Sequence, residues 1–380
     1  MKLSKLLTVA AMLLAGVAFA QQEQWLEYHT GTEGRAYHNV RLTTNAPAGI
    51  ALPKLNGLAY FGRWLTPMDP AGGRWFCLDR TKPSGMYDRL FIDTTGNGRL
   101  DDKSPVQAHT DAYYSRFAPV PLIFKGEDGP ITYHIAFQCY QYEMKPQQML
   151  AMSAGWYEGV VNFDGAKKRI EIIDGNVNGT FNDLSLDPYD SDRVQVEGDK
   201  TTERFLGRLL EVDGKFYRVE TARDGASIKV QKENVTLGQV RVPENISEFA
   251  AFGSNGHFVR KPVQGEFTLP VGRYRIFRWA INRKDDKGAA WTLSGYDFPK
   301  SASFTVAADK PVELKIGEPV QAVLKAEEHP NRQIEFSLNF QGLQKESIEM
   351  LRTGERPRGP KLMLANAAGT VCYTNTFEFG

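Results

Sequence analysis

The sequence predicts an all-β protein made of antiparallel meanders and hairpins, with a C-terminal β-sandwich of the immunoglobulin-like or transthyretin-like kind. Strand-like runs recur along the chain, punctuated by 35 glycines and 20 prolines. Asp-Gly pairs join several of these runs, and this pair favours a type I′ hairpin turn because both central residues need positive φ. From about residue 241 the strands become short and are punctuated by Pro and Gly.

The first 20 residues have the pattern of a secretory signal peptide. A basic start is followed by a short apolar run and by the A-x-A sequence at 18–20, which predicts cleavage after Ala20. The apolar run is too short for a permanent membrane anchor. A lipoprotein signal would need a cysteine where Val17 stands. We therefore expect a periplasmic or extracellular protein with no membrane insertion in its mature form.

Length and charge limit the domain number and the partners. About 360 residues remain after the signal peptide, enough for two or three domains. We predict an N-terminal β domain at 21–150, a β-meander at 151–240 and a β-sandwich at 241–380. The 46 basic residues balance 45 acidic ones, so nothing favours nucleic acid or an anionic membrane as a partner. Three cysteines allow at most one disulfide.

The clearest hairpin signal lies in the middle of the chain. Strand-like runs at 156–163 and 166–173 flank Asp164-Gly165. With further Asp-Gly pairs at positions 213 and 224, residues 156–231 are predicted to form an antiparallel meander. Short helices are expected only at 145–154 and 342–353.

A ten-residue pattern occurs twice, at 93–102 and 174–183, each time directly after a strand-like run. Oxygen-bearing residues occupy loop positions 1, 3, 5 and 9, glycine occupies position 6, and an apolar residue occupies position 8. Calcium takes six to eight oxygen ligands from short side chains and main-chain carbonyls. The pattern therefore predicts one or two calcium sites. The expected ligands are Asp93, Thr95, Asn97, the carbonyl of Arg99, and Asp101 or Asp102 in the first loop, and Asp174, Asn176, Asn178, the carbonyl of Thr180, and Asn182 or Asp183 in the second.

These loops resemble the EF-hand-like, dockerin-type calcium loops of secreted bacterial proteins. They depart from the EF-hand at position 12, where Ser104 and Ser185 replace a bidentate glutamate. A carboxylate from Asp102, Asp183 or Asp187 would have to complete the shell, and with so few carboxylates we expect dissociation constants of about 10⁻⁴–10⁻³ M. Asn-Gly pairs also form turns without any metal, so a metal-free hairpin end is the alternative interpretation.

The C-terminal region carries a second resemblance. Its run at 265–275 contains the order leucine, proline, any residue, glycine, any residue, tyrosine, which ends at Tyr274. This order is similar to a turn of carboxypeptidase-regulatory or transthyretin-like β-sandwiches. The resemblance implies a sandwich fold and no particular reaction.

No catalytic motif is present. The six histidines stand singly, without the spacing of a zinc site, and no nucleophile elbow or phosphate-binding loop is found. We therefore expect a non-catalytic binding or structural protein with a glycan or protein ligand. The alternative is a carbohydrate-active or other hydrolase with a hidden carboxylate pair, for which Glu158, Asp164 and Glu171 are candidates. Candidate sugar platforms are Trp64, Trp75, Trp156, Trp279, Trp291, Tyr113, Tyr114, Tyr140 and Tyr142.

Overall fold

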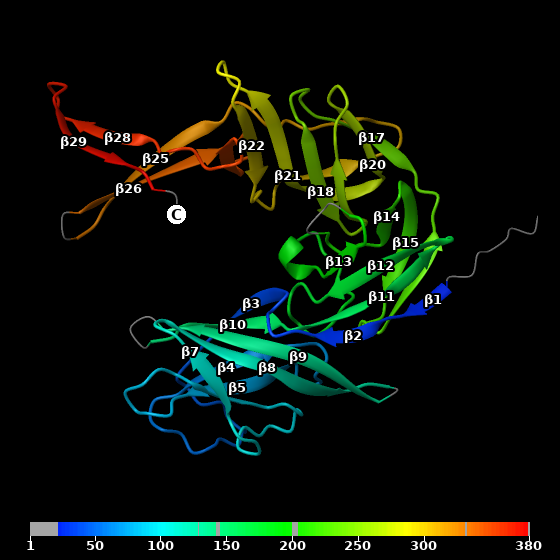
Figure 1. The fold of residues 1–380 in the computed structure, drawn as a ribbon, viewed down its shortest axis with the longest axis vertical. Coiled ribbons are helices and arrows are strands. Elements are labelled where there is room, and N and C mark those ends of the chain that lie inside the picture. Colours follow the sequence, from blue (N-terminus) through cyan, green and yellow to red (C-terminus); the bar gives the residue numbers. More distant parts are fainter. Residues whose placement is uncertain (1–21, 128, 142–144, 200–203, 331–332, 379–380) are drawn as a thin grey trace, which may run out of the picture.

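The computed structural model confirms the all-β class (Figure 1). It describes residues 22–127, 129–141, 145–199, 204–330 and 333–378. In these residues the chain forms β-strands and one 3₁₀ turn, Pro188–Asp190, and no α-helix. The predicted signal peptide lies outside the described residues, and the predicted domain boundaries stay predictions.

The N-terminal part is an eight-stranded antiparallel sheet that curls into a nearly closed barrel. A bridge between Thr43, just after one terminal strand, and Phe61, in the other, brings the two ends of the sheet together. Alternate side chains point inward, as the period of two along a strand requires. In spatial order the strands are β3 (Ala36–Arg41), β10 (Gln148–Ser153), β9 (Pro130–Tyr140), β8 (Tyr114–Lys125), β7 (Val106–Thr110), β6 (Arg89–Ile92), β5 (Gly73–Asp79) and β4 (Tyr60–Leu65).

Two four-stranded antiparallel sheets form the middle of the molecule and share one hydrophobic core with the barrel. Phe163 of one sheet packs edge-on against Tyr217 of the other, with ring centroids 5.1 Å apart. The first sheet has the order β1 (Gln22–Trp25), β16 (Ser227–Lys232), β15 (Lys215–Thr221), β14 (Leu209–Val212). The second has the order β13 (Arg193–Val196), β12 (Ala166–Ile173), β11 (Gly155–Phe163), β2 (Glu27–Thr30).

Two of the three predicted Asp-Gly turns have the expected backbone, whereas at Asp224-Gly225 only the glycine has a positive φ, of 85°. Asp164 and Gly165 have φ values of 54° and 96°, and they join β11 to β12 in direct register. Asp213 and Gly214, with φ values of 50° and 75°, join β14 to β15 in the same way. Positive φ at both central residues is the requirement of a type I′ turn.

The C-terminal part has a second core, built between a small sheet and a large one. Tyr274 is buried and donates a hydrogen bond from its hydroxyl to the carbonyl of Pro270, at 2.8 Å, which fixes the predicted turn. The small sheet has the order β20 (Glu266–Pro270), β17 (Leu237–Arg241), β24 (Val312–Glu313). The large sheet has the order β19 (Gly256–Arg260), β18 (Glu248–Gly253), β21 (Gly272–Lys284), β22 (Ala290–Tyr296), β27 (Ser347–Arg352), β26 (Ile334–Gln341), β25 (Gln321–Glu328), and β23 (Ser303–Val306) also pairs with β21.

Two hairpins extend from this sheet at one end of the molecule, namely β25–β26 and the separate pair β28 (Lys361–Ala365) and β29 (Val371–Thr376) (Figure 1). Strands β28 and β29 are antiparallel. The cysteines are all free, with Cys77 and Cys139 buried and Cys372 exposed. Burial raises the pKa of both buried thiols to about 12, which keeps them protonated.

The two predicted helices are wrong. Residues 148–153 form β10, which pairs with β3 on one side and β9 on the other. Residues 347–352 form β27, which pairs with β22. Hydrogen bonds to neighbouring strands decide the structure of both segments, and a weak local helix preference cannot compete with them.

Candidate calcium loops

Each of the two predicted loops follows a strand and is closed by its first aspartate in the same way. Asp93 Oδ2 accepts a hydrogen bond from Gly98 N at 2.9 Å, and Asp174 Oδ2 accepts one from Gly179 N at 2.7 Å. In both loops the other carboxylate oxygen accepts from the main-chain N of the position-5 asparagine at 3.2 Å. The repeated pattern therefore produces a repeated local structure.

In each loop the side-chain amide of the asparagine at position 5 donates a hydrogen bond to the aspartate at position 10. Asn97 Nδ2 donates to Asp102 Oδ2 at 2.9 Å, and Asn178 Nδ2 donates to Asp183 Oδ2 at 2.9 Å. Asp101 instead forms an ion pair with Arg99, and Asn182 is exposed. The sequence offered two candidate ligands at the end of each loop, at positions 9 and 10. The aspartate at position 10 is the one that is hydrogen-bonded to the asparagine of the same loop.

The first loop has a buried cation beside it. The Arg74 guanidinium lies 2.5 Å from Asp69 Oδ2 and 3.6 Å from Asp93 Oδ1, and it is almost fully buried. Burial lowers the pKa of Arg74, and the two aspartates oppose that shift. Thr95 is exposed, and its main-chain N donates to Asp93 at 3.2 Å. Asp93 therefore has a buried positive charge close by.

The second loop gathers acids instead. Asp174 is fully buried and accepts a hydrogen bond from the Tyr133 hydroxyl at 2.8 Å. Asp192, also buried, accepts from Gly175 N at 3.0 Å and from Asp183 N at 2.7 Å. In the part of the chain that the structure describes, no basic side chain forms an ion pair with Asp174, Asp183 or Asp192.

This arrangement shifts Asp174 and Asp192 toward their protonated forms. Burial raises the pKa of Asp174 to about 6, although hydrogen bonds from Gly179, Tyr133 and Asn178 act in the opposite direction. Burial, together with the charges of Asp174 and Asp183, raises the pKa of Asp192 well above its ordinary value. A positive charge placed among these groups would favour their ionised forms.

One further atom bears on whether a cation fits the second loop. Asn176 Oδ1 is buried and has no hydrogen-bond partner, whereas Asn176 Nδ2 lies 3.3 Å from Asp183 Oδ2. Buried acceptors without a partner are rare in folded proteins. Among the described residues, no three histidine, cysteine, aspartate or glutamate side chains are gathered in the arrangement of a metal site. A cation here would therefore rely on amide, hydroxyl and main-chain oxygens as well as on carboxylates.

The second loop also joins two parts of the molecule. Val177 has a φ of 57°, is buried, and accepts a hydrogen bond from Trp64 Nε1 of the barrel at 2.6 Å. The Trp64 ring stacks on Tyr133 at 5.5 Å, and Tyr133 also contacts Phe181 of the loop. The loop is thus packed between barrel strands β4 and β9 and the middle sheets, so its shape affects how they fit together.

Sequence reasoning missed Tyr133 and Arg74, because they meet the loops only in three dimensions. It considered Asp192 only as the end of the acidic tract at 186–192, which could supply extra ligands to the second loop. The predicted ligand Asp187 does not join the loop. Its side chain accepts from Tyr189 N at 3.3 Å and pairs with Lys300 at 3.1 Å.

The three candidate catalytic acids of a hydrolase all form ion pairs. Glu158 and Glu171 lie directly opposite each other on β11 and β12, but Glu158 pairs with Arg169 at 3.2 Å and Glu171 pairs with Arg35. Asp164 pairs with Lys232 at 3.0 Å. Each acid therefore forms an ion pair with a basic side chain, and the side chains of Glu158 and Glu171 are only 21% and 16% exposed.

The candidate tryptophans are largely covered, whereas the candidates Tyr113 and Tyr140 have 55% and 50% of their surface exposed. Trp64 and Trp279 are completely buried, and arginine guanidinium groups lie over the rings of the other three candidate tryptophans, Trp75, Trp156 and Trp291. Tyr142 lies outside the described residues. Trp25, which the sequence did not single out, has 74% of its surface exposed.

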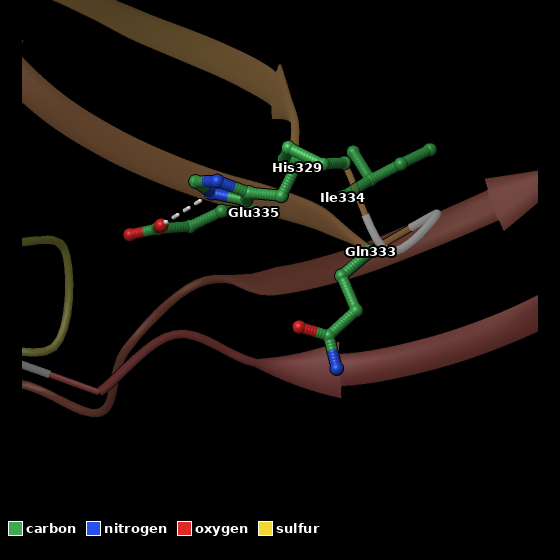
Figure 2. Close-up of a pocket in the computed structure, with 5 residues that line it drawn as sticks. His329, Gln333, Ile334 and Glu335 are labelled. Carbon is green, nitrogen blue, oxygen red and sulfur yellow. Dashed lines mark hydrogen bonds and ion pairs between the residues drawn. The ribbon is translucent and has the colours of Figure 1, made fainter.

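Two surface hollows are found in the described part of the chain, and the second of them borders the second loop. One, at the tip of the β25–β26 hairpin, contains His329 and Glu335, whose Nε2 and Oε2 atoms are 3.1 Å apart (Figure 2). The other is bordered by Asn182 of the second loop, by Leu184, and by Arg208, Arg218 and Glu220, which lie in or next to strands β14 and β15. Neither brings together two carboxylates that lack a basic partner.

Comparison with protein-family models, curated proteins and solved structures gave no match. The likeness to dockerin-type loops and to transthyretin-like sandwiches therefore stays a prediction. None of the described residues belongs to a helix long and apolar enough to cross a membrane.

Proposed function

We propose that this protein is an exported, non-catalytic binding or structural protein in which calcium bound at the second loop fastens the barrel to the middle sheets. The observation that carries the proposal is the set of three acids, Asp174, Asp183 and Asp192, with no basic partner among the described residues and with the unpaired oxygen of Asn176 beside them. Oxygen-rich, acidic surroundings of this kind suit a hard cation such as calcium.

The candidate ligands differ in what they offer. Asp174 and Asp183 supply carboxylate oxygens, Asn176 and Asn178 supply amide oxygens, and Thr180 supplies its carbonyl. Asp192 supports the loop by holding Gly175 N and Asp183 N, and it adds negative charge. When bound, calcium would neutralise the mutual repulsion of the three acids and so stabilise the loop against the barrel.

The first loop has less need of a cation. Arg74 supplies a fixed positive charge next to Asp93, and a second cation in the same place would be repelled by it. We therefore assign one calcium ion to the protein rather than two.

A glycan or a protein is the proposed ligand class. Support comes from the open strand faces and from exposed aromatic side chains such as Trp25 and Tyr189. A hydrolase is the less favoured function, because the candidate acids Glu158, Asp164 and Glu171 all form ion pairs.

Thermal melting with calcium and with a chelator tests the metal part of the proposal. A ligand that binds only the folded state raises stability by mass action. At about 10 mM calcium and a dissociation constant of about 10⁻⁴–10⁻³ M, the gain is about 1.4–2.7 kcal/mol. Identical melting curves in calcium and in chelator would contradict the proposal. An array of glycans, probed in calcium, then tests the ligand class.

A further inference from the structure

Strand β25 is a free edge of the large C-terminal sheet. Among the described residues it is the last strand in the sheet order and pairs only with β26. Seven of its eight residues are exposed, and Leu324 has 54% of its surface exposed. Figure 1 shows this hairpin at one end of the molecule, in the same region of the view as β28 and β29. A long, open edge strand presents unpaired main-chain groups that can pair with another strand.

The charges on this edge are not balanced within the hairpin. Glu327 lies directly opposite Glu335 on β26, and like charges in this position are destabilising. Glu335 contacts His329 at 3.1 Å (Figure 2). Lys325 lies opposite Ser337. In the described part of the chain, neither Lys325 nor Glu327 forms an ion pair.

We propose that β25 pairs edge to edge with β25 of a second copy of this chain, antiparallel, about a two-fold axis at Ala326. In this register, Lys325 lies opposite Glu327 of the second copy, and Glu327 lies opposite Lys325 of the second copy. Each Glu327 then has a cation on its open side. Ala326 meets its own counterpart, where its small side chain leaves room for both strands.

The charges select this register over its neighbours. If the axis passed through Lys325, two lysines would lie opposite each other, and if it passed through Glu327, two glutamates would. Both arrangements are destabilising. An axis at Ala326, perpendicular to the sheet, also keeps the apolar sides of the two hairpins on one face. On each copy this side carries Ala322, Leu324 and Ala326 of β25 and Ile334, Phe336, Leu338 and Phe340 of β26.

The contact is confined to one strand of each copy, so it belongs to the class of small, transient interfaces. We therefore expect a weak, reversible dimer. Its formation should weaken as salt is added, because the Lys325–Glu327 pairs are exposed to solvent.

Sedimentation equilibrium of the full chain over a range of protein concentrations tests the proposal. We expect a reversible monomer–dimer equilibrium. Lys325→Glu and Glu327→Lys should each weaken dimerisation about tenfold, because each replaces two attractive pairs with two repulsive ones. The double variant K325E/E327K rebuilds both pairs with reversed sign and should restore the affinity of the wild type.

Both positions are exposed, so all three variants should fold normally, and circular dichroism checks this. A wild-type protein that stays monomeric at every concentration would overturn the proposal. So would a dimer whose affinity is unchanged in either single variant, or one that the double variant fails to restore.

Discussion

The two calcium-type loops share a sequence pattern and a hydrogen-bonding pattern, yet their surroundings differ in charge. In the first, Asp93 lies beside the buried guanidinium of Arg74. In the second, Asp174 lies near Asp183 and Asp192, with a tyrosine hydroxyl as its side-chain partner. The comparison teaches that ten residues are enough to define the shape of such a loop. The charge that surrounds the loop is decided by residues outside those ten.

Burial separates the loops as well. Thr95, Asn97 and Asp102 of the first loop are exposed, whereas the second loop is packed against Trp64 and Tyr133 of the barrel. Electrostatic interactions are stronger where water is excluded. The same acid therefore has a greater effect on stability in the second loop than in the first.

The largest expected difference comes from removing the first aspartate of each loop. Asp174→Ala leaves the Tyr133 hydroxyl and the main-chain N atoms of Asn178 and Gly179 without their acceptor in a buried site, which should cost about 4 kcal/mol of unfolding free energy. Asp93→Ala is the matched variant. It should cost about 2 kcal/mol, because water can reach the exposed main-chain donors of that loop.

Denaturant unfolding of both variants in chelator measures these two free energies. Equal losses, or a larger loss for Asp93→Ala, would show that the second loop has no special role in joining the barrel to the middle sheets.

Arg74→Met removes the positive charge next to the first loop. It leaves Asp69 and Asp93 without their cation and should lower the unfolding free energy in chelator by about 3 kcal/mol. Part of this loss should be recovered in calcium, because the first loop then has acids without a base, like the second. Arg116→Met removes an exposed ion pair with Asp111 and serves as the control, with an expected loss much smaller than that of Arg74→Met.

Chemical denaturation with and without calcium measures both effects. A loss no larger than that of the control would mean that Arg74 is not the counter-charge of the first loop. A loss that calcium does not reduce would mean that charge alone does not distinguish the loops.

A change of pH should have a smaller effect on the free energy of unfolding. The pKa of Asp174 is raised from 3.8 to about 6, so its stabilising contribution is complete below pH 3.8 and is lost as the pH rises through 6. The raised pKa of Asp192 acts in the same direction. In chelator, the wild type should therefore lose about 2 kcal/mol relative to Asp174→Asn between pH 4 and pH 7. Melting of both proteins across this range measures the difference, and a constant difference would contradict the assigned shift.

The sequence predicted much of the fold wherever the signal was local. Asp164-Gly165 and Asp213-Gly214 determine hairpins through their own φ angles, and the strands before Asp93 and Asp174 were recognised from their composition. The segments at 145–154 and 342–353 were wrongly expected to be helical, since the strands that pair with them are distant in the sequence.

The charge around each loop could not be predicted from the sequence, because residues that surround the loops are distant in the chain. Tyr133 is 41 residues from Asp174, and Trp64 is 113 residues from Val177. Asp192 lies closer, 17 residues from Gly175, but within the acidic tract at 186–192 only Asp187 was singled out as a ligand. A pattern search finds the loop, whereas only the folded chain shows which acids and bases surround it.

Calorimetric titration of the protein with calcium tests directly whether the second loop binds calcium. We expect one ion per chain, with a dissociation constant of about 10⁻⁴–10⁻³ M. Asp174→Asn should abolish this binding, whereas Asp93→Asn should leave it intact. No binding in the wild type, or binding that survives Asp174→Asn but is lost in Asp93→Asn, would contradict this expectation.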